Sequence, residues 1–169
     1  MPIRDERTRK KNRELLRELN GSGYDREEVI ARERKLLQIE TEGTFYINVS
    51  FQFDCGCNLH FSGLFYANTE CFFLDTGDIN FGKHVRLGPR IQIYTVNHLV
   101  NPIERLDKGL TITSPVTIGD NVWIGGGSII NPRVMIGANT VISSGSVMTK
   151  SLPVNVLAAG VPAKVIREI

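Results

Sequence analysis

The sequence predicts an all-β solenoid, a parallel β-helix, preceded by a helical hairpin and followed by a short C-terminal tail or helix. Three observations support this fold class. Aliphatic residues recur every six positions, charged residues concentrate in the first 42 residues, and no apolar run approaches the length of a membrane helix. The chain has 169 residues, 41% hydrophobic and 22% charged, which fits one domain with a small appendage.

Residues 1–42 predict an N-terminal helical cap. They hold 11 of the 20 Lys and Arg residues and 10 of the 18 Asp and Glu residues. Two apolar stripes at helical spacing lie on either side of a turn at residues 21–23: Leu15, Leu16 and Leu19, then Val29, Ile30, Leu36 and Leu37. Asp25 can cap the second helix. A basic run over residues 7–13 could contact an anion, although interleaved acidic residues favour a solvated face.

Residues 43–169 follow a period of six. From Ile118 the chain divides into IGDNVW, IGGGSI, INPRVM, IGANTV and ISSGSV, and every block begins with isoleucine. The fifth place is always small or β-branched: Val122, Ser128, Val134, Thr140 and Ser146. The phase extends upstream through Leu87 and Phe81, and more weakly to Phe61. Neither an α-helix nor a plain alternating strand has this period.

A β-helix explains the repeat. Each block is a short strand and a turn, three blocks close one coil, and the isoleucines form an inner ladder. Gly and Asn then lie at corners, where a positive φ costs little for Gly and is tolerated by Asn. The exposed strand edges at both ends need caps, which we assign to the helical hairpin and to the tail from about residue 151.

The repeat stops after Tyr94-Thr95-Val96-Asn97-His98 and resumes near Val116. The intervening stretch, at about 99–114, is polar and contains Pro102 and Gly109, which predicts a loop that leaves the prism. His98 lies where the coil opens, a position that can border a cleft. The residues alone leave a catalytic and a non-chemical role for His98 equally open.

The three cysteines, Cys55, Cys57 and Cys71, predict buried thiols rather than a disulfide framework. Their number is odd, and the charged start of the chain has no apolar signal-peptide core. We therefore expect a cytoplasmic protein that does not contact a membrane. The net charge of +2 is too small to predict a nucleic-acid partner.

Several stretches resemble the hexapeptide-repeat acyltransferases, most closely the branch of maltose and galactoside O-acetyltransferases. They are SPVTIGDNVWIGGGSIINPRVMIGANTVISSGSVMTKSLPVNVLAAGVPAKVIREI, FYANTECFFLD and LGPRIQIYTVNH. The resemblance implies a left-handed parallel β-helix and a homotrimer with active sites at its subunit interfaces. It also implies acetyl-coenzyme A as co-substrate, no metal, and a small acceptor bearing a hydroxyl, such as a sugar.

The resemblance also assigns residues to roles. It makes His98 the catalytic base and places the backbone N–H of Gly126 at the reacting carbonyl. Trp123 would contact the pantetheine arm, and the other coenzyme-binding positions are Ser144, Thr149, Lys150, Lys164 and Arg167. The acceptor-binding positions are Asp54, Tyr66 and Asn68.

The residues themselves add to two of these assignments. Trp123 lies between two inward-facing places, so strand alternation points it outward, toward a ligand or a neighbouring subunit. Lys164 and Arg167 are three positions apart, so a helical tail would place both on one face, ready to bind phosphate.

The expected reaction is the transfer of an acetyl group to a hydroxyl, with His98 as general base and no covalent enzyme intermediate. Other acceptors on the same fold are an antibiotic hydroxyl, an amino sugar or serine. A metal lyase similar to the gamma-type carbonic anhydrases would instead use His60, His84 and His98 around zinc. A trimeric scaffold without catalytic activity is the remaining alternative.

Overall fold

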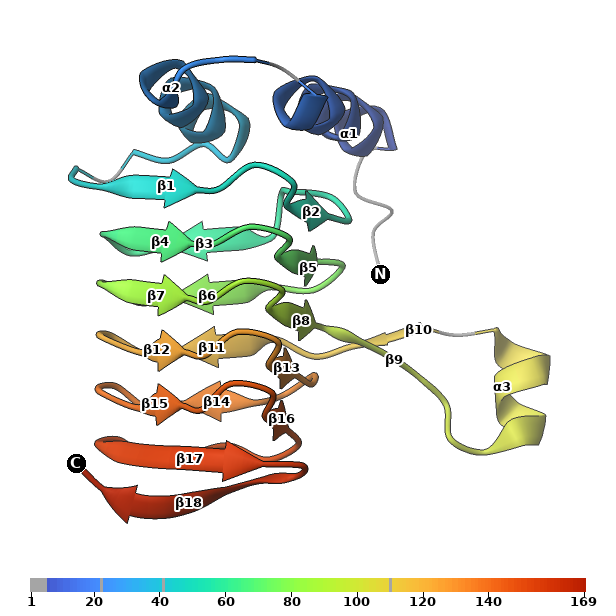
Figure 1. Ribbon diagram of the computed structural model, residues 1–169. Coiled ribbons are helices and arrows are strands. Elements are labelled where there is room, and N and C mark those ends of the chain that lie inside the picture. Colours follow the sequence, from blue (N-terminus) through green and yellow to red (C-terminus); the bar gives the residue numbers. More distant parts are fainter. Residues whose placement is uncertain (1–5, 22, 41, 110) are drawn as a thin grey trace.

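The computed structural model describes residues 6–21, 23–40, 42–109 and 111–169, and it shows a left-handed parallel β-helix with a helical cap (Figure 1). We name its three sides by the order in which the chain visits them. The first face contains β1 (Phe45–Ile47), β4 (Phe65–Ala67), β7 (Val85–Leu87), β12 (Trp123–Ile124), β15 (Val141–Ile142), β17 (Val156–Gly160) and β18 (Ala163–Glu168).

The other two faces are purely parallel. The second face contains β2 (Gln52–Phe53), β5 (Phe72–Leu74), β8 (Gln92–Tyr94), β13 (Ile129–Ile130) and β16 (Val147–Met148). The third face contains β3 (Leu59–Phe61), β6 (Ile79–Phe81), β11 (Val116–Ile118) and β14 (Met135–Ile136). Each strand pairs with the equivalent strand of the next coil, so the backbone hydrogen bonds of a coil are made by its neighbours.

The predicted inner ladder is confirmed. All five repeat isoleucines are at most 2% exposed, and the fifth-place residues are at most 1% exposed. The earlier coils fill the same interior with phenylalanines; the rings of Phe61 and Phe81, for example, stack with centroids 5.0 Å apart. Burial of this continuous apolar column is the main stabilising contribution to the prism.

The corners differ in part from the prediction. A positive φ occurs at the fourth place of the repeat, as at Asn121 and Asn139, and this place also accepts arginine at Arg133. The second-place glycines have another reason: a Cβ on Gly119 would lie 2.7 Å from the backbone nitrogen of Ala138 in the next coil. They are required by the close stacking of coils rather than by a positive φ.

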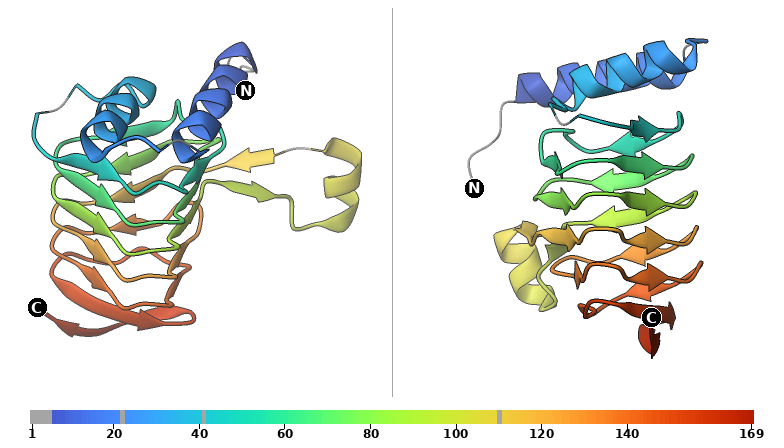
Figure 2. Two further views of the ribbon diagram at one scale, coloured as in Figure 1. Left: turned by 45° about the horizontal axis from the view of Figure 1, so that its top comes forward. Right: turned by 90° about the vertical axis from the view of Figure 1, so that its left-hand side faces the viewer.

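The N-terminal cap is the predicted helical hairpin, formed by α1 (Glu6–Gly21) and α2 (Arg26–Leu36), which lie side by side over the first coil (Figure 2). Asp25 caps α2 as expected, because its Oδ1 accepts the Glu28 N–H at 2.9 Å. Leu16, Leu19, Val29, Leu36 and Leu37 are buried and belong to the prism core. The hairpin therefore covers the first coil with its apolar stripes, although Leu15, which was predicted in the first stripe, is 39% exposed.

The C-terminal tail is a strand rather than a helix. β18 folds back antiparallel on β17 and covers its free edge. None of the helices in the described ranges is long and apolar enough to cross a membrane.

The predicted excursion is an arm with its own secondary structure. β9 (Val96–His98) and β10 (Thr111–Thr113) pair antiparallel, and α3 (Pro102–Lys108) lies beyond them. The helix was not predicted, although its boundaries are visible in the sequence. Asn101 caps its N-terminus, Pro102 occupies its first turn, and Gly109 ends it in the left-handed region.

Asn139 gives a test of the corner geometry. Its side chain accepts from Asn121 at 3.0 Å and donates to Asn155 at 2.9 Å, while its φ is +56°. Asn139→Ala should lower the free energy of unfolding by about 1–2 kcal/mol, because alanine in this region is strained and the ladder is broken. Asn139→Gly should cost less in urea denaturation, because glycine adopts this positive φ without strain. Equal losses of unfolding free energy in the two variants would show that the positive φ at position 139 is not what disfavours alanine.

The buried Glu33 gives a pH-dependent prediction. It is 0% exposed, its Oε2 accepts the Ile47 N–H at 3.1 Å, and its Oε1 has no hydrogen-bond partner among the described residues. Burial raises the pKa of this carboxyl from 4.5 to about 8. Between these values the unfolded chain releases a proton that the folded chain keeps, so stability should fall as the pH rises through this window.

Glu33→Gln keeps an acceptor for Ile47 but does not titrate. Urea denaturation at several pH values should therefore show a smaller loss of stability for this variant between pH 4.5 and about 8. Parallel pH profiles for the native protein and the variant would show that the carboxyl is not buried in its neutral form.

Candidate active site

The first face carries one group of the predicted site residues. Tyr66 on β4 and Trp123 on β12 both point outward in one column, with Arg86 of β7 between them. Trp123 is 56% exposed, which confirms its outward orientation. Asn68 follows β4 at the corner, where its Oδ1 accepts a hydrogen bond from Asn48 at 3.2 Å.

Gly126 lies at the corner that follows Trp123 and β12. Its backbone N–H finds no acceptor among the described residues, whereas the N–H groups of Gly125 and Gly127 are both hydrogen-bonded. A Cβ on Gly88 of the preceding coil would lie 2.5 Å from the Gly126 nitrogen, so glycine at position 88 keeps this corner closely packed. Ser144 is exposed one coil further along the same edge. An unpaired, fixed N–H is the type of donor that stabilises a developing oxyanion.

Lys164 and Arg167 lie on β18, at the end of the first face. The expectation that they share a face of a helix is wrong, since the segment is a strand. The register of β18 shifts opposite Leu157 and Ala158, so Lys164 lies opposite Ala159 and Arg167 opposite Leu157. Because residues opposite each other in a sheet share a face, the shift returns both cations to one side.

A second group follows the opposite edge of the second face. The arm leaves from this edge after β8, and His98 lies on β9, opposite Thr111 and exposed. No hydrogen bond or ion pair to the His98 ring is present within the described part of the chain. Thr149 and Lys150 follow β16 on the same edge and are also exposed.

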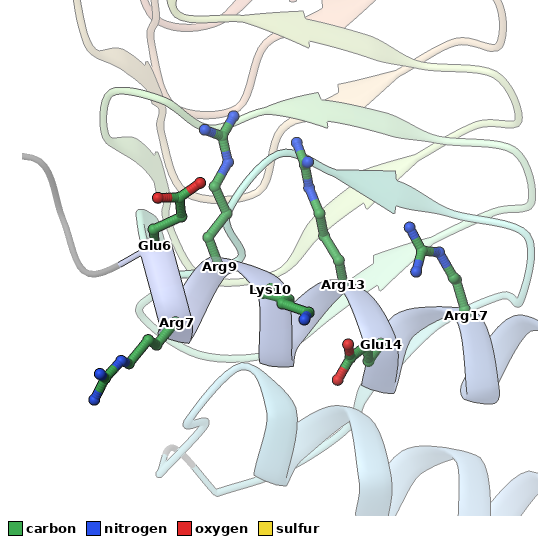
Figure 3. Close-up of a pocket in the computed structure, with 7 residues that line it drawn as sticks. All are labelled: Glu6, Arg7, Arg9, Lys10, Arg13, Glu14 and Arg17. Atoms are coloured by element: carbon green, nitrogen blue, oxygen red, sulfur yellow. The ribbon is translucent and has the colours of Figure 1, made fainter.

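The same edge meets α1 near the start of the prism. Seven residues of α1 line an open cavity of about 740 Å³, and five of them are cationic. Figure 3 shows Arg9, Arg13 and Arg17 projecting to one side of the helix. The other lining residues are Glu6, Arg7, Lys10 and Glu14.

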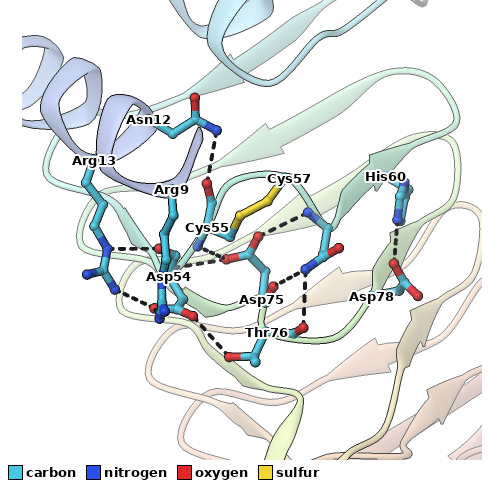
Figure 4. The surroundings of a disulfide bond; sticks show 11 residues. Arg9, Asn12, Arg13, Asp54, Cys55, Cys57, His60, Asp75, Thr76 and Asp78 are labelled. Carbon is cyan, nitrogen blue, oxygen red and sulfur yellow. Dashed lines mark hydrogen bonds and ion pairs between the residues drawn. A yellow bond between two sulfur atoms is a disulfide. The ribbon is translucent and has the colours of Figure 1, made fainter. Parts of the chain in front are cut away.

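Asp54 connects α1 to the prism (Figure 4). It follows β2 and is only 7% exposed, and its Oδ1 pairs with the guanidinium groups of Arg9 and Arg13. Thr76 donates to the other carboxylate oxygen at 3.1 Å. Although burial opposes ionisation, the bonds from Arg9 and Thr76 hold the pKa of the Asp54 carboxyl below its usual range.

The turn after Asp54 corrects the prediction for two of the cysteines. Cys55 and Cys57 form a disulfide, with Cα atoms 5.2 Å apart (Figure 4). Gly56 has a φ of +71°, so the chain reverses tightly enough for residues two positions apart to pair. Cys71 is a buried free thiol as predicted, and burial raises its pKa to about 11.

Asp75 organises this turn and was not predicted as a site residue. It is 0% exposed, and its carboxylate accepts N–H groups from Asp54, Cys55 and Asn58 at 2.9, 2.8 and 3.2 Å. Burial raises the pKa of Asp75, while these three backbone bonds oppose the shift. An acidic residue directly after the strand residues FFL was the available signal in the sequence.

The other two histidines lie elsewhere. His60 on β3 is bonded to Asp78 at 2.9 Å, and His84 occupies a corner with a φ of +60°. Over the described ranges, no group of three or more His, Cys, Asp or Glu side chains is arranged to hold a metal ion.

The predicted residues thus form two groups in one chain. The first-face group contains Tyr66, Asn68, Trp123, Gly126 and Ser144. The arm-edge group contains Asp54, His98, Thr149 and Lys150. Within one prism the second face lies between them (Figure 1), so a single chain does not bring the histidine beside the tryptophan.

Comparisons with known proteins agree with this architecture. The family described as bacterial transferase hexapeptide (six repeats) matches residues 115–150. A hexapeptide-repeat acetyltransferase of Vibrio cholerae, solved in complex with acetyl-coenzyme A, superimposes with a TM-score of 0.89 and 31% identity, over 99% of this chain and 90% of that one.

Two further relatives have more similar sequences. A maltose O-acetyltransferase structure from Clostridium difficile is 40% identical, with a TM-score of 0.85, over 96% of this chain and 87% of that one. The galactoside O-acetyltransferase of Escherichia coli is 44% identical over 117 residues, which are 69% of this chain and 57% of the relative. The chain therefore belongs to the hexapeptide-repeat family of acetyltransferases.

Proposed function

We propose that this protein transfers an acetyl group from acetyl-coenzyme A to a hydroxyl of a sugar or a similar small acceptor. The observation that carries the proposal is the corner of the first face, where the unpaired N–H of Gly126 lies three residues from the exposed indole of Trp123. A free donor beside an apolar platform suits a thioester carbonyl and the chain attached to it.

Acetyl-coenzyme A supplies the activated acetyl group as a thioester. His98 takes the proton of the acceptor hydroxyl as the hydroxyl oxygen bonds to the acetyl carbon. The carbon–sulfur bond then breaks, and the coenzyme leaves as a thiol that receives this proton from His98. The Gly126 N–H donates to the carbonyl oxygen as negative charge develops there. The two substrates react directly, without a covalent enzyme intermediate.

The remaining predicted residues have binding roles in this proposal. The coenzyme would lie against Trp123, Ser144, Thr149 and Lys150, with its phosphates near Lys164 and Arg167. The two cations suit phosphate because they share one side of β18. Tyr66 and Asn68 would contact the acceptor directly, and Asp54 would act at the acceptor end of the site.

We propose further that the active form is a homotrimer with its sites between subunits. The arm-edge group of one copy would face the first-face group of the next, which would bring His98 to Gly126. The arm supports this arrangement, because Val100, Ile103 and Leu106 are 91, 68 and 84% exposed in the single chain. Contact with a second copy would bury such side chains.

Experiments can distinguish the proposed function from the alternatives on the same fold. Amine or hydroxyl acceptors on amino sugars, serine or antibiotics would use the same His98 and Gly126. A zinc lyase would leave the Trp123 platform and the Gly126 N–H without a role, and stoichiometric zinc in the purified protein would support it. A scaffold would show no acetyltransferase activity.

The role of His98 can be measured directly. His98→Ala should lower turnover about 10²–10⁴-fold, because the hydroxyl loses its general base. Coenzyme binding, followed by calorimetry, should stay nearly unchanged. His60→Ala is the matched control, since His60 is exposed on another face, and it should retain activity. Equal turnover in the two variants would remove His98 from the mechanism.

Shared sites predict complementation between two defective variants. Trp123→Ala should weaken acetyl-coenzyme A binding about tenfold through loss of its indole surface. When His98→Ala and Trp123→Ala chains are mixed in equal amounts and reassembled, about a quarter of the interfaces should contain both native groups. Activity at low acetyl-coenzyme A should then exceed that of either variant alone. No recovery in confirmed mixed trimers would place the site within one chain.

A further inference from the structure

The basic side of α1 is the strongest feature that the proposed mechanism does not use. Arg9, Arg13 and Arg17 are four positions apart, so they lie in one row along the helix (Figure 3). Together with Arg7 and Lys10 they supply five positive charges around the cavity of about 740 Å³, against the two carboxylates of Glu6 and Glu14.

The prism does not neutralise this charge. Asp54 is the carboxylate that meets the row, and both of its oxygens are already engaged, one by Arg9 and Arg13 and the other by Thr76. Arg17 is exposed and takes part in no ion pair with any described residue.

Two of the guanidinium groups also keep N–H donors that no described residue accepts. The Nε of Arg9 is buried and has no acceptor among the described residues, although its terminal nitrogen pairs with Asp54. Arg13 uses its Nε on the Asp54 carbonyl at 2.9 Å and one terminal nitrogen on the carboxylate, so its other terminal nitrogen stays available. Asp54 therefore orients Arg9 and Arg13 while leaving some of their N–H donors without an acceptor among the described residues.

The Arg9–Arg13 end of the cavity lies on the edge where the reaction would occur, and Arg17 lies one helical turn further along α1. α1 lies above the side of the prism from which the arm projects, and the views in Figure 2 agree on this placement. Asp54 and Thr76 follow successive strands of the second face, and the arm with His98 leaves after the next strand, β8. One molecule on this edge could therefore contact both α1 and His98.

We propose that the acceptor carries an oxyanion, a carboxylate or a phosphate, and that Arg13 and Arg17 bind it while a hydroxyl of the same molecule reaches His98. Guanidinium groups recognise both oxyanions through paired hydrogen bonds. This inference rests on the proposed function and narrows its substrate class from small hydroxyl compounds to anionic ones. Asp54 is then a positioning residue for Arg9 and Arg13.

Acetyl transfer to matched acceptors tests the charge preference. Galactose, galacturonate and galactose 6-phosphate differ at one carbon, so the two anions distinguish a carboxylate from a phosphate. The native enzyme should show a kcat/KM about tenfold higher for at least one anion than for galactose. Arg17→Gln should remove this preference by raising the KM for the anionic acceptor.

Two further variants complete the test. Lys35→Gln removes one positive charge from α2, away from the cavity, and should keep the preference. Arg13→Gln should also abolish the preference for the anion. Because Arg13 also binds Asp54, this variant could fold poorly, and the Arg17→Gln variant then decides the result. An effect of Arg17→Gln on the KM for acetyl-coenzyme A instead would assign the row to the coenzyme and overturn the proposal.

Direct binding separates this inference from the proposed function. Calorimetry with the preferred anion and no coenzyme should give a dissociation constant that rises about tenfold in Arg17→Gln and not in Lys35→Gln. Such binding without acetyl transfer to any acceptor would overturn the function and keep the anion site. Efficient transfer to galactose with no preference for either anion, and no Arg17-dependent binding, would keep the function and overturn the anion site.

Discussion

Close stacking of the coils governs the corners, the faces and the caps of this protein. Each coil satisfies its backbone hydrogen bonds through the coils on either side, so successive corners meet almost in contact. The second place holds glycine in three of the five clear blocks, as at Gly125, where a Cβ would lie 2.5 Å from the Ser144 nitrogen. The fourth place turns the chain in the left-handed region, which asparagine tolerates.

The close stacking of the coils also determines where functional groups can lie. Because the interior is filled by aliphatic and aromatic side chains, functional groups are confined to the outward faces, the corners and the arm. A corner can hold a backbone N–H in a fixed position, and Gly126 does so. The arm is inserted at a corner without disturbing the coils, so His98 is presented away from the prism.

The helical cap links stability to the candidate site. α2 packs on the first coil with the buried Glu33, while α1 is tied to the prism by Asp54. The turn that carries Asp54 is held by the Cys55–Cys57 disulfide and by three backbone bonds to Asp75. The same arginines that fasten α1 leave positive charge on the edge that carries the arm.

Sequence periodicity was sufficient for the prism because the repeat is local: each isoleucine occupies the interior through its place in a six-residue block. The helical hairpin and the outward Trp123 also followed from local patterns and are confirmed. The C-terminal strand and the Cys55–Cys57 disulfide did not follow. β18 forms because the edge of β17 needs a partner, and the disulfide depends on how Gly56 turns beneath α1.

For the candidate site, too, some features followed from local sequence patterns and others did not. Local sequence patterns identified the residues proposed for the chemistry: an imidazole at the end of the repeat, a lone tryptophan and the cations of the tail. Their positions follow from the folding of the whole chain, which puts His98 on the arm, Trp123 on the first face and Asp54 beside arginines of α1. The physical reason is that these relations join residues distant in the chain, whose proximity is set by the stacking of coils and the docking of the cap rather than by local spacing.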